Sequence, residues 1–253
     1  MNYRDMEIMT VLTRQLQPPQ DDSLGALIEG LDKIGGLKEG DVLAVTSKIV
    51  SIYEGRAIAM SSIQDKDQLI ISQAERYLPR EMVPHNYAIL TIKNHVLAPS
   101  AGIDESNGAA YYILLPAEPE NITRAWRNIL LHRYNLTNLG LILTDSRSTP
   151  LRLGVVGIGL AFAGFHPLRD YRGQPDLFGR PMKISQSNIV DSLAAVAVYA
   201  MGECAEQTPA AIIRGVDGLQ FTDDDCSQEL WLDQSDDIYE PLYHNFLPGG
   251  GMK

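Results

Sequence analysis

The sequence predicts a mixed α+β fold in which several sheets pack against helices. Segments rich in β-branched residues alternate irregularly with segments whose apolar residues recur every three to four positions. The chain has no GxxxxGKS/T motif, no GxGxxG motif after a strand and no internal repeat. Neither a P-loop nor a Rossmann nucleotide-binding fold is therefore expected. A composition of 45% hydrophobic and 21% charged residues is ordinary for a globular protein of 253 residues.

The first half of the chain shows both patterns. Capping residues open the segment DDSLGALIEGLDKIGG, its leucines recur at helical spacing, and a Gly-Gly pair ends it. The segment DVLAVTSKIVSI is rich in β-branched residues, which is typical of a buried strand. The expected elements of this half are helices over 21–36 and 62–78 and strands over 41–52, 87–94 and 111–116.

The second half adds two longer helices and two buried strands. The segment VVGIGLAFAGF is apolar and rich in glycine, which indicates a strand with close backbone neighbours. The expected elements are helices over 120–135 and 188–203, strands over 139–145 and 155–165, and a final patterned segment over 209–215. We divide the chain into one domain over 1–217 and an acidic, peripheral C-terminal tail over 218–253. An arrangement of the first part as two intertwined subdomains is compatible with the pattern.

Charge and cysteine content narrow the function. A net charge of −11 argues against a nucleic-acid partner, which favours a basic face. No apolar run reaches the roughly 18 residues that span a bilayer, and MNYRDMEIMT lacks the apolar core of a signal peptide. Cys204 and Cys226 show neither metal-ligand spacing nor a disulfide framework. We expect two free thiols and a cytoplasmic protein that binds no membrane.

The loop AGIDESNG, residues 101–108, places four polar side chains between two glycines. One interpretation is a solvated turn with hydrogen bonds from side chains to its own backbone. The other is a loop that directs oxygen ligands, Asp104 first among them, at a hard cation. Composition leaves both open.

Acidic residues also occur at the ends of later elements. Asp145 and Ser146 end the strand LILTDS, and Glu203 ends the long helix. Carboxylate and hydroxyl oxygens suit Mg²⁺ or Mn²⁺, which usually keep several waters. The alternative is helix capping or solvated turn carboxylates.

Two further segments carry cationic side chains. In DYRGQPDLFGR, Arg172 and Arg180 alternate with aspartates, so they either bind a phosphate or carboxylate or staple a long loop through internal ion pairs. In TSKIV, Ser47 and Lys48 either contact a phosphate or are solvated. The five histidines lie in unrelated contexts, which argues against nucleophilic or zinc catalysis.

Together these segments resemble one family. The resemblance is carried by GDVLAVTSKIVSIYEGR, AGIDESN, the strand-ending TD, GVVGIGLAFAG, DYRGQPDLFGR and the helix ending in MGE. Taken together, these segments are similar to segments of coenzyme F420-0:L-glutamate ligases. The resemblance covers roughly residues 10–215. The resemblance implies an unusual α+β fold, a homodimer, two divalent ions (Mg²⁺ or Mn²⁺) and GTP, or ATP, as cosubstrate. The implied reaction joins the amino group of L-glutamate to a carboxylate of a phosphate-bearing deazaflavin precursor.

Site residues follow from the resemblance by position. Asp104 and Asp145 would bind the first metal ion, and Ser146 and Glu203 the second. Arg172 or Arg180 would hold glutamate or an acceptor phosphate. The implied nucleotide contacts are Ser47, Lys48, Asn107, Met201, Gly202, Glu206 and Thr208.

The chain also departs from the family pattern. The family usually has lysine where this chain has Ile52, and cationic or aromatic side chains where it has Thr149, Leu151 and Leu153. These changes spare the implied metal ligands, so the expected reaction class is better supported than the acceptor. A folate-type acceptor is one alternative, and a degenerate binding protein or a metal-dependent hydrolase are others.

Overall fold

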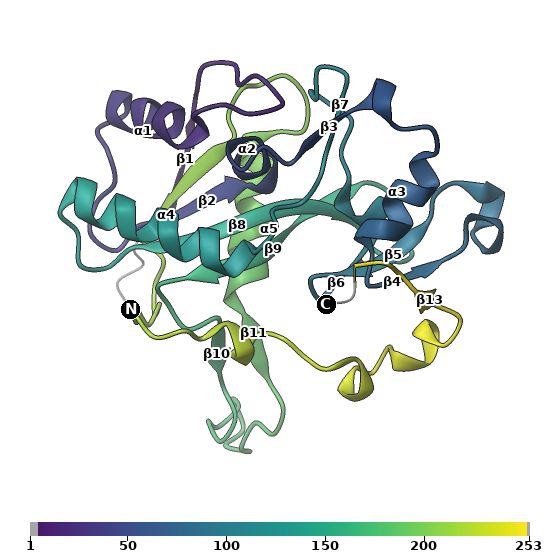
Figure 1. Cartoon of the computed structure of the whole chain (residues 1–253). Coiled ribbons are helices and arrows are strands. Elements are labelled where there is room, and N and C mark those ends of the chain that lie inside the picture. The colour runs from purple at the N-terminus through teal and green to yellow at the C-terminus, as the bar shows by residue number, and fades with distance from the viewer. Residues whose placement is uncertain (1–4, 252–253) are drawn as a thin grey trace.

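A five-stranded mixed sheet forms the larger layer of the computed structural model, which describes residues 5–251 (Figure 1). Its strand order is β1-β12-β2-β8-β9, and only the β2–β8 pair among these neighbours is parallel. The strands are β1 (Glu7–Val11), β12 (Ala210–Arg214), β2 (Val42–Thr46), β8 (Gly140–Ser148) and β9 (Val155–Ala163).

Helices cover both faces of this sheet because its central strands are apolar on both sides. On β2, Leu43 and Val45 pack into the core shared with one group of helices, whereas Val42 and Ala44 pack into the core shared with α5. The first group is α1 (Ser23–Lys33), α2 (Ser47–Tyr53) and α4 (Pro119–Tyr134), and the opposite helix is α5 (Ile189–Met201).

A smaller layer lies beside the first (right side of Figure 1). Its antiparallel sheet has the order β13-β4-β5-β6, and α3 packs near it together with a two-stranded ribbon. The elements are β13 (Leu247–Pro248), β4 (Arg76–Leu78), β5 (Leu90–Lys93), β6 (Val96–Pro99), α3 (Lys66–Gln73), β3 (Ala57–Ala59) and β7 (Tyr111–Ile113).

Short elements complete the fold. The hairpin of β10 (Leu168–Asp170) and β11 (Gln186–Asn188) projects away from the main sheet (Figure 1). The 3₁₀ turns are η1 (Met60–Ser62), η2 (Arg80–Met82), η3 (Pro84–Asn86), η4 (Ser100–Gly102), η5 (Ser227–Glu229), η6 (Gln234–Asp236) and η7 (Glu240–Tyr243). The predicted mixed α+β fold is confirmed.

Two predicted elements are wrong in part. The segment 41–52 is not one strand, because β2 ends at Thr46 and α2 begins at Ser47. Its β-branched residues pack as one buried face of a helix, so tertiary burial overrides their strand preference. The predicted helix 62–78 is confined to α3, and its last residues form β4.

The glycine-rich strand has the close neighbour that its sequence predicts. A Cβ on Gly157 would lie 2.5 Å from the carbonyl oxygen of Ala194, and one on Gly159 would lie 2.4 Å from Val190. Both neighbours belong to α5 of the same chain, so glycine here serves helix-on-strand packing. This face of β9 is therefore covered by a helix of the same chain.

The segment after Gly218 lies along the outside of both layers. It is acidic, as the sequence shows, but Cys226, Tyr243 and Phe246 are buried. Its last strand, β13, pairs with β4. Within residues 5–251, every helix is too short or too polar to cross a bilayer.

Candidate functional site

The predicted site segments meet because of the register of the main sheet. In the parallel β2–β8 pair, Thr46 lies opposite Thr144, so Ser47 and Asp145 follow at the same edge. The N–H of Thr46 donates to the carbonyl of Pro209 at 2.9 Å, which brings the segment after α5 to this edge as well. Three segments far apart in sequence therefore lie side by side.

A cavity of about 510 Å³ opens at this edge. It is lined by the loop after η4, the start of α2, the middle of β8 and the segment after α5. Its lining includes eleven predicted site residues: Ser47, Lys48, Asp104, Asn107, Asp145, Ser146, Met201, Gly202, Glu203, Glu206 and Thr208.

Asp104 is held by a network within its own loop and by one lysine. Its Oδ1 accepts from the N–H of Ser106 at 2.7 Å and from the Ser106 hydroxyl at 2.8 Å. Lys48 Nζ lies 2.6 Å from Asp104 Oδ2 and donates to the Ser106 carbonyl at 2.9 Å. Burial raises the pKa of Asp104, but Lys48 and Ser106 outweigh it, so the net shift is downward. The loop is thus both a side-chain-capped turn and a carboxylate presented to the cavity.

Asp145 has the opposite electrostatic environment. Burial raises its pKa to about 7, against the effect of the hydrogen bond donated by the N–H of Ser146 at 2.9 Å. The nearby carboxylates of Asp104 and Glu203 raise it further. Lys48 opposes this rise without cancelling it. A bound divalent ion would offset the remaining excess of negative charge. Asp145 lies within β8, which continues past the end of β2, and not at a strand terminus as predicted.

The segment after α5 forms the remaining wall. Glu203 Oε2 accepts from the Ser146 hydroxyl at 3.4 Å, and the Thr208 hydroxyl donates to the Met201 carbonyl at 2.6 Å. Asn107 Nδ2 donates to the Cys204 carbonyl at 2.7 Å. The last bond ties the loop of the smaller layer to the end of α5.

The donor set fits divalent ions that prefer oxygen. Asp104, Asp145 and Glu203 contribute carboxylates and Ser146 a hydroxyl, all lining one cavity. Asp104, Asp145 and Glu203 are more widely spaced than the three-ligand cluster that the described residues form elsewhere.

Arg172 and Arg180 lie outside this cavity. Both are exposed on the β10–β11 hairpin, and the Arg172 guanidinium pairs with Asp170 at 2.6 Å. The N–H of Arg180 donates to Asp176 at 2.9 Å, which closes the turn. Of the two interpretations, the internal Arg–Asp network accounts for the contacts of Arg172 within this chain.

The sequence analysis missed Arg14, which lines the cavity together with Thr13. Its guanidinium pairs with Asp21 at 2.6 Å. Arg14 and Lys48 are the cationic side chains among the lining residues that the structure describes. Arg14 lies in a stretch without periodicity or motif, so no local signal marked it.

The residues that depart from the family pattern lie in two separate places. Ile52 lines the cavity and is only 3% exposed. Leu151 and Leu153 are fully exposed at the tip between β8 and β9, away from the cavity. In a single copy of the chain, only the change at Ile52 alters the cavity wall.

Separated carboxylates, hydroxyls and a lysine thus line one cavity at the end of the parallel strand pair. The model of the F420-0:gamma-glutamyl ligase family matches residues 13–215. The chain belongs to this family.

Three relatives illustrate the similarity, each a coenzyme F420:L-glutamate ligase. The one from Methanopyrus kandleri is 33% identical over 81% of this chain and 84% of its own length. The one from Haloarcula marismortui is 31% identical over 92% of this chain and 95% of its own length. The one from Methanocaldococcus jannaschii is 30% identical over 71% of this chain and 77% of its own length.

Proposed function

We propose that this protein is a nucleotide- and metal-dependent γ-glutamyl ligase. It would join the amino group of L-glutamate to a carboxylate of a cofactor-like acid and cleave GTP, or ATP, in doing so. Membership of the family supports the reaction class. The observation that carries the proposal is the gathering of Lys48, Asp104, Asp145 and Glu203 around one cavity.

The reaction needs an activated carboxylate because amide formation from a free acid is uphill in water. The acceptor carboxylate attacks the γ-phosphorus, the bond to the β-phosphate oxygen breaks, and a nucleoside diphosphate leaves. The deprotonated amine of glutamate then attacks the acyl carbon, and inorganic phosphate leaves with the electron pair of the broken C–O bond. Lys48 and Arg14 would bind negative oxygens of the nucleotide or acceptor.

The proposed ligands would hold two metal ions. Asp104 and Asp145 would hold one ion, and Ser146 with Glu203 the other. When bound, such ions neutralise the charge on phosphate oxygens during transfer. Lys48, whose ammonium lies against Asp104, would then be free to turn toward a phosphate.

The acceptor is the open part of this proposal. The family's description favours F420-0 as the acceptor, and the relatives are named for coenzyme F420. A folate is a second candidate because Ile52 places an apolar, uncharged surface on the cavity wall. One lost charge-assisted hydrogen bond is worth roughly 1.5–3 kcal/mol, or about one to two decades in binding.

Product mass is the direct test. Reactions containing F420-0 or a reduced folate, glutamate, nucleotide and Mg²⁺ or Mn²⁺ are analysed by mass spectrometry. Gain of a glutamyl unit on either acceptor supports the ligase and identifies the acceptor. Ile52→Lys should shift preference toward the phosphate-bearing deazaflavin, and adding Thr149→Arg and Leu153→Arg tests whether the β8–β9 tip contributes.

Phosphate release separates the rival functions. A ligase releases phosphate only when glutamate and acceptor are both present, whereas a hydrolase needs neither. Asp104→Asn should abolish release, and the exposed Asp236→Asn, which lies away from the cavity, is the matched control. Tight nucleotide binding with no turnover on either acceptor would favour a degenerate binding protein.

A further inference from the structure

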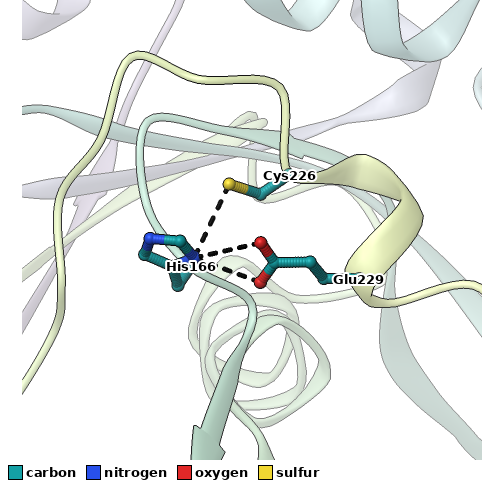
Figure 2. A group of neighbouring side chains, drawn as sticks. All are labelled: His166, Cys226 and Glu229. Atoms are coloured by element: carbon teal, nitrogen blue, oxygen red, sulfur yellow. Dashed lines mark hydrogen bonds and ion pairs between the residues drawn. The ribbon is translucent and has the colours of Figure 1, made fainter.

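A second polar cluster lies on the side of the main sheet where β9 ends. His166 follows β9, Cys226 precedes η5, and Glu229 ends η5. Figure 2 shows the three side chains pointing toward one another from two separate stretches of chain. Their ligand atoms all lie within 4.8 Å of one another, and none of the three residues lines the cavity described above.

The spacing of these atoms matches the edges of a tetrahedral zinc site. A zinc ion bonded to sulfur at about 2.3 Å and to nitrogen at about 2.0–2.1 Å holds those atoms roughly 3.5 Å apart, and holds nitrogen and oxygen ligands roughly 3.3 Å apart. Cys226 Sγ lies 3.6 Å from His166 Nδ1. The two Glu229 oxygens lie 3.1 and 3.2 Å from the same nitrogen. The distances from His166 Nδ1 thus fit two edges of such a site, and the sulfur and the Glu229 carboxylate lie within 4.8 Å of each other.

The backbone holds both ligand-bearing stretches in place. The N–H of His166 donates to the Gln220 carbonyl at 2.9 Å, and Phe165 forms a β-bridge with Phe221. In the 3₁₀ turn, residues three apart lie on the same side, which aligns Cys226 with Glu229. Backbone contacts therefore help to position His166, Cys226 and Glu229 relative to one another.

Salt bridges from α4 fasten the same stretch. Arg127 Nη2 lies 2.8 Å from Asp223, and Arg124 pairs with Asp225. Asp225 also accepts from the N–H of Ser227 at 3.1 Å. The start of η5 is thus anchored to the main layer before any ion binds.

The donor set selects a different class of ion from the cavity. Imidazole, thiolate and carboxylate together favour zinc-class ions, whereas Mg²⁺ prefers oxygen ligands only. Cysteine binds a metal as the thiolate, so a bound ion would displace the proton of the Cys226 thiol. The ion would in turn offset the local excess of carboxylates.

We propose that His166, Cys226 and Glu229 bind a zinc-class divalent ion that fastens the segment after Gly218 to the end of β9. Cys226 and Glu229 lie beyond residues 13–215, which the family model matches, whereas His166 lies within them. Sequence spacing gave no hint of this site, because His166 lies 60 residues before Cys226.

Cobalt substitution tests the site directly. The metal-free full-length protein is titrated with Co²⁺, and the thiolate-to-cobalt charge-transfer band in the near ultraviolet is followed. We expect saturation at about one equivalent per chain, displacement by Zn²⁺ and no displacement by excess Mg²⁺. Cobalt bound by oxygen ligands in the cavity gives no such band, so the two sites are read separately.

Variants assign the ligands. Cys226→Ser should lose the band, while Cys204→Ser, which removes the other free cysteine, should keep it. Glu229→Gln and His166→Gln retain the thiol and should weaken Co²⁺ and Zn²⁺ binding, with folding checked by circular dichroism. Zn²⁺ should also slow proteolytic cleavage after Gly218. Absence of the band in folded wild-type protein, or its persistence in Cys226→Ser, would overturn the proposal.

Discussion

Replacing Asp145 with Asn should stabilise the metal-free protein at and above neutral pH while abolishing its activity. Burial is the first cause of the raised pKa of this side chain, and the nearby Asp104 and Glu203 add to it. The Ser146 N–H and Lys48 oppose the rise without cancelling it, so without a bound metal ion the ionised carboxylate is held at a cost. Asparagine has nearly the same shape and removes that charge.

The sign and size follow from proton linkage. The native pKa of about 7 lies above the ordinary value of 3.8, so the native state binds the proton more tightly than the unfolded state does. The free energy of unfolding of the wild type should accordingly fall as pH rises from about 4 to about 7. The full difference corresponds to roughly 4 kcal/mol, and partial solvation leaves an expected gain of roughly 1–3 kcal/mol for Asp145→Asn at pH 8.

The assay is urea unfolding of both proteins between pH 4 and pH 8 with a chelator present. Plotted against pH, the free energies of unfolding of the two proteins should nearly coincide at the acidic end and separate as pH rises. Adding Mg²⁺ should stabilise the wild type and leave the variant nearly unchanged. Asp236→Asn, an exposed substitution away from the cavity, serves as the control. Equal or lower stability of Asp145→Asn at pH 8 would refute the electrostatic account of the cavity.

Three further predictions concern helix packing, a buried ion pair and the oligomeric state. Gly159→Ala should destabilise the protein by roughly 1–3 kcal/mol in urea unfolding, because the added methyl group would lie 2.4 Å from Val190; an unchanged midpoint would show that α5 can move aside. Arg214→Met should cost roughly 2–4 kcal/mol because it leaves Asp41, which is fully buried, with an uncompensated charge, and a loss below 1 kcal/mol would contradict this. We expect a homodimer, which would give about twice the 27.9 kDa chain mass in light scattering. Phe178→Ser removes an apolar side chain that is 89% exposed on the β10–β11 hairpin, and it should shift the mass toward the monomer. A monomeric wild type at all concentrations would rule this out.

The spacing of apolar residues along the chain predicted the helices in which buried positions recur at regular intervals. Helices α1, α4 and α5 fall close to their predicted bounds because their apolar residues line one face each. Periodicity failed at 41–52, where the same β-branched residues suit a buried strand and a buried helical face equally well. The change from strand to helix at Thr46 depends on tertiary packing that a single segment does not encode.

The candidate site was predictable in its parts but not in its assembly. Asp104, Asp145 and Glu203 were marked by their positions near element ends and by resemblance. Their meeting depends on the parallel register of β2 and β8, which neither strand specifies alone. Arg14 and the His166–Cys226–Glu229 cluster were missed for the same reason, because long-range contacts create them.

The cavity has walls that belong to different hydrophobic cores. Ile103 and Leu114, beside the Asp104 loop, pack with Ile70 in the smaller layer, whereas Asp145 lies on a strand of the main sheet. The two layers also share apolar contacts, because Val96 of β6 and Leu115 pack into the core of the main sheet. The direct ties across this gap include the Lys48–Asp104 ion pair and the hydrogen bond from Asn107 to Cys204. A ligand that binds both walls would add to these ties, so its binding should raise the stability of the boundary between the layers as well as fill the cavity.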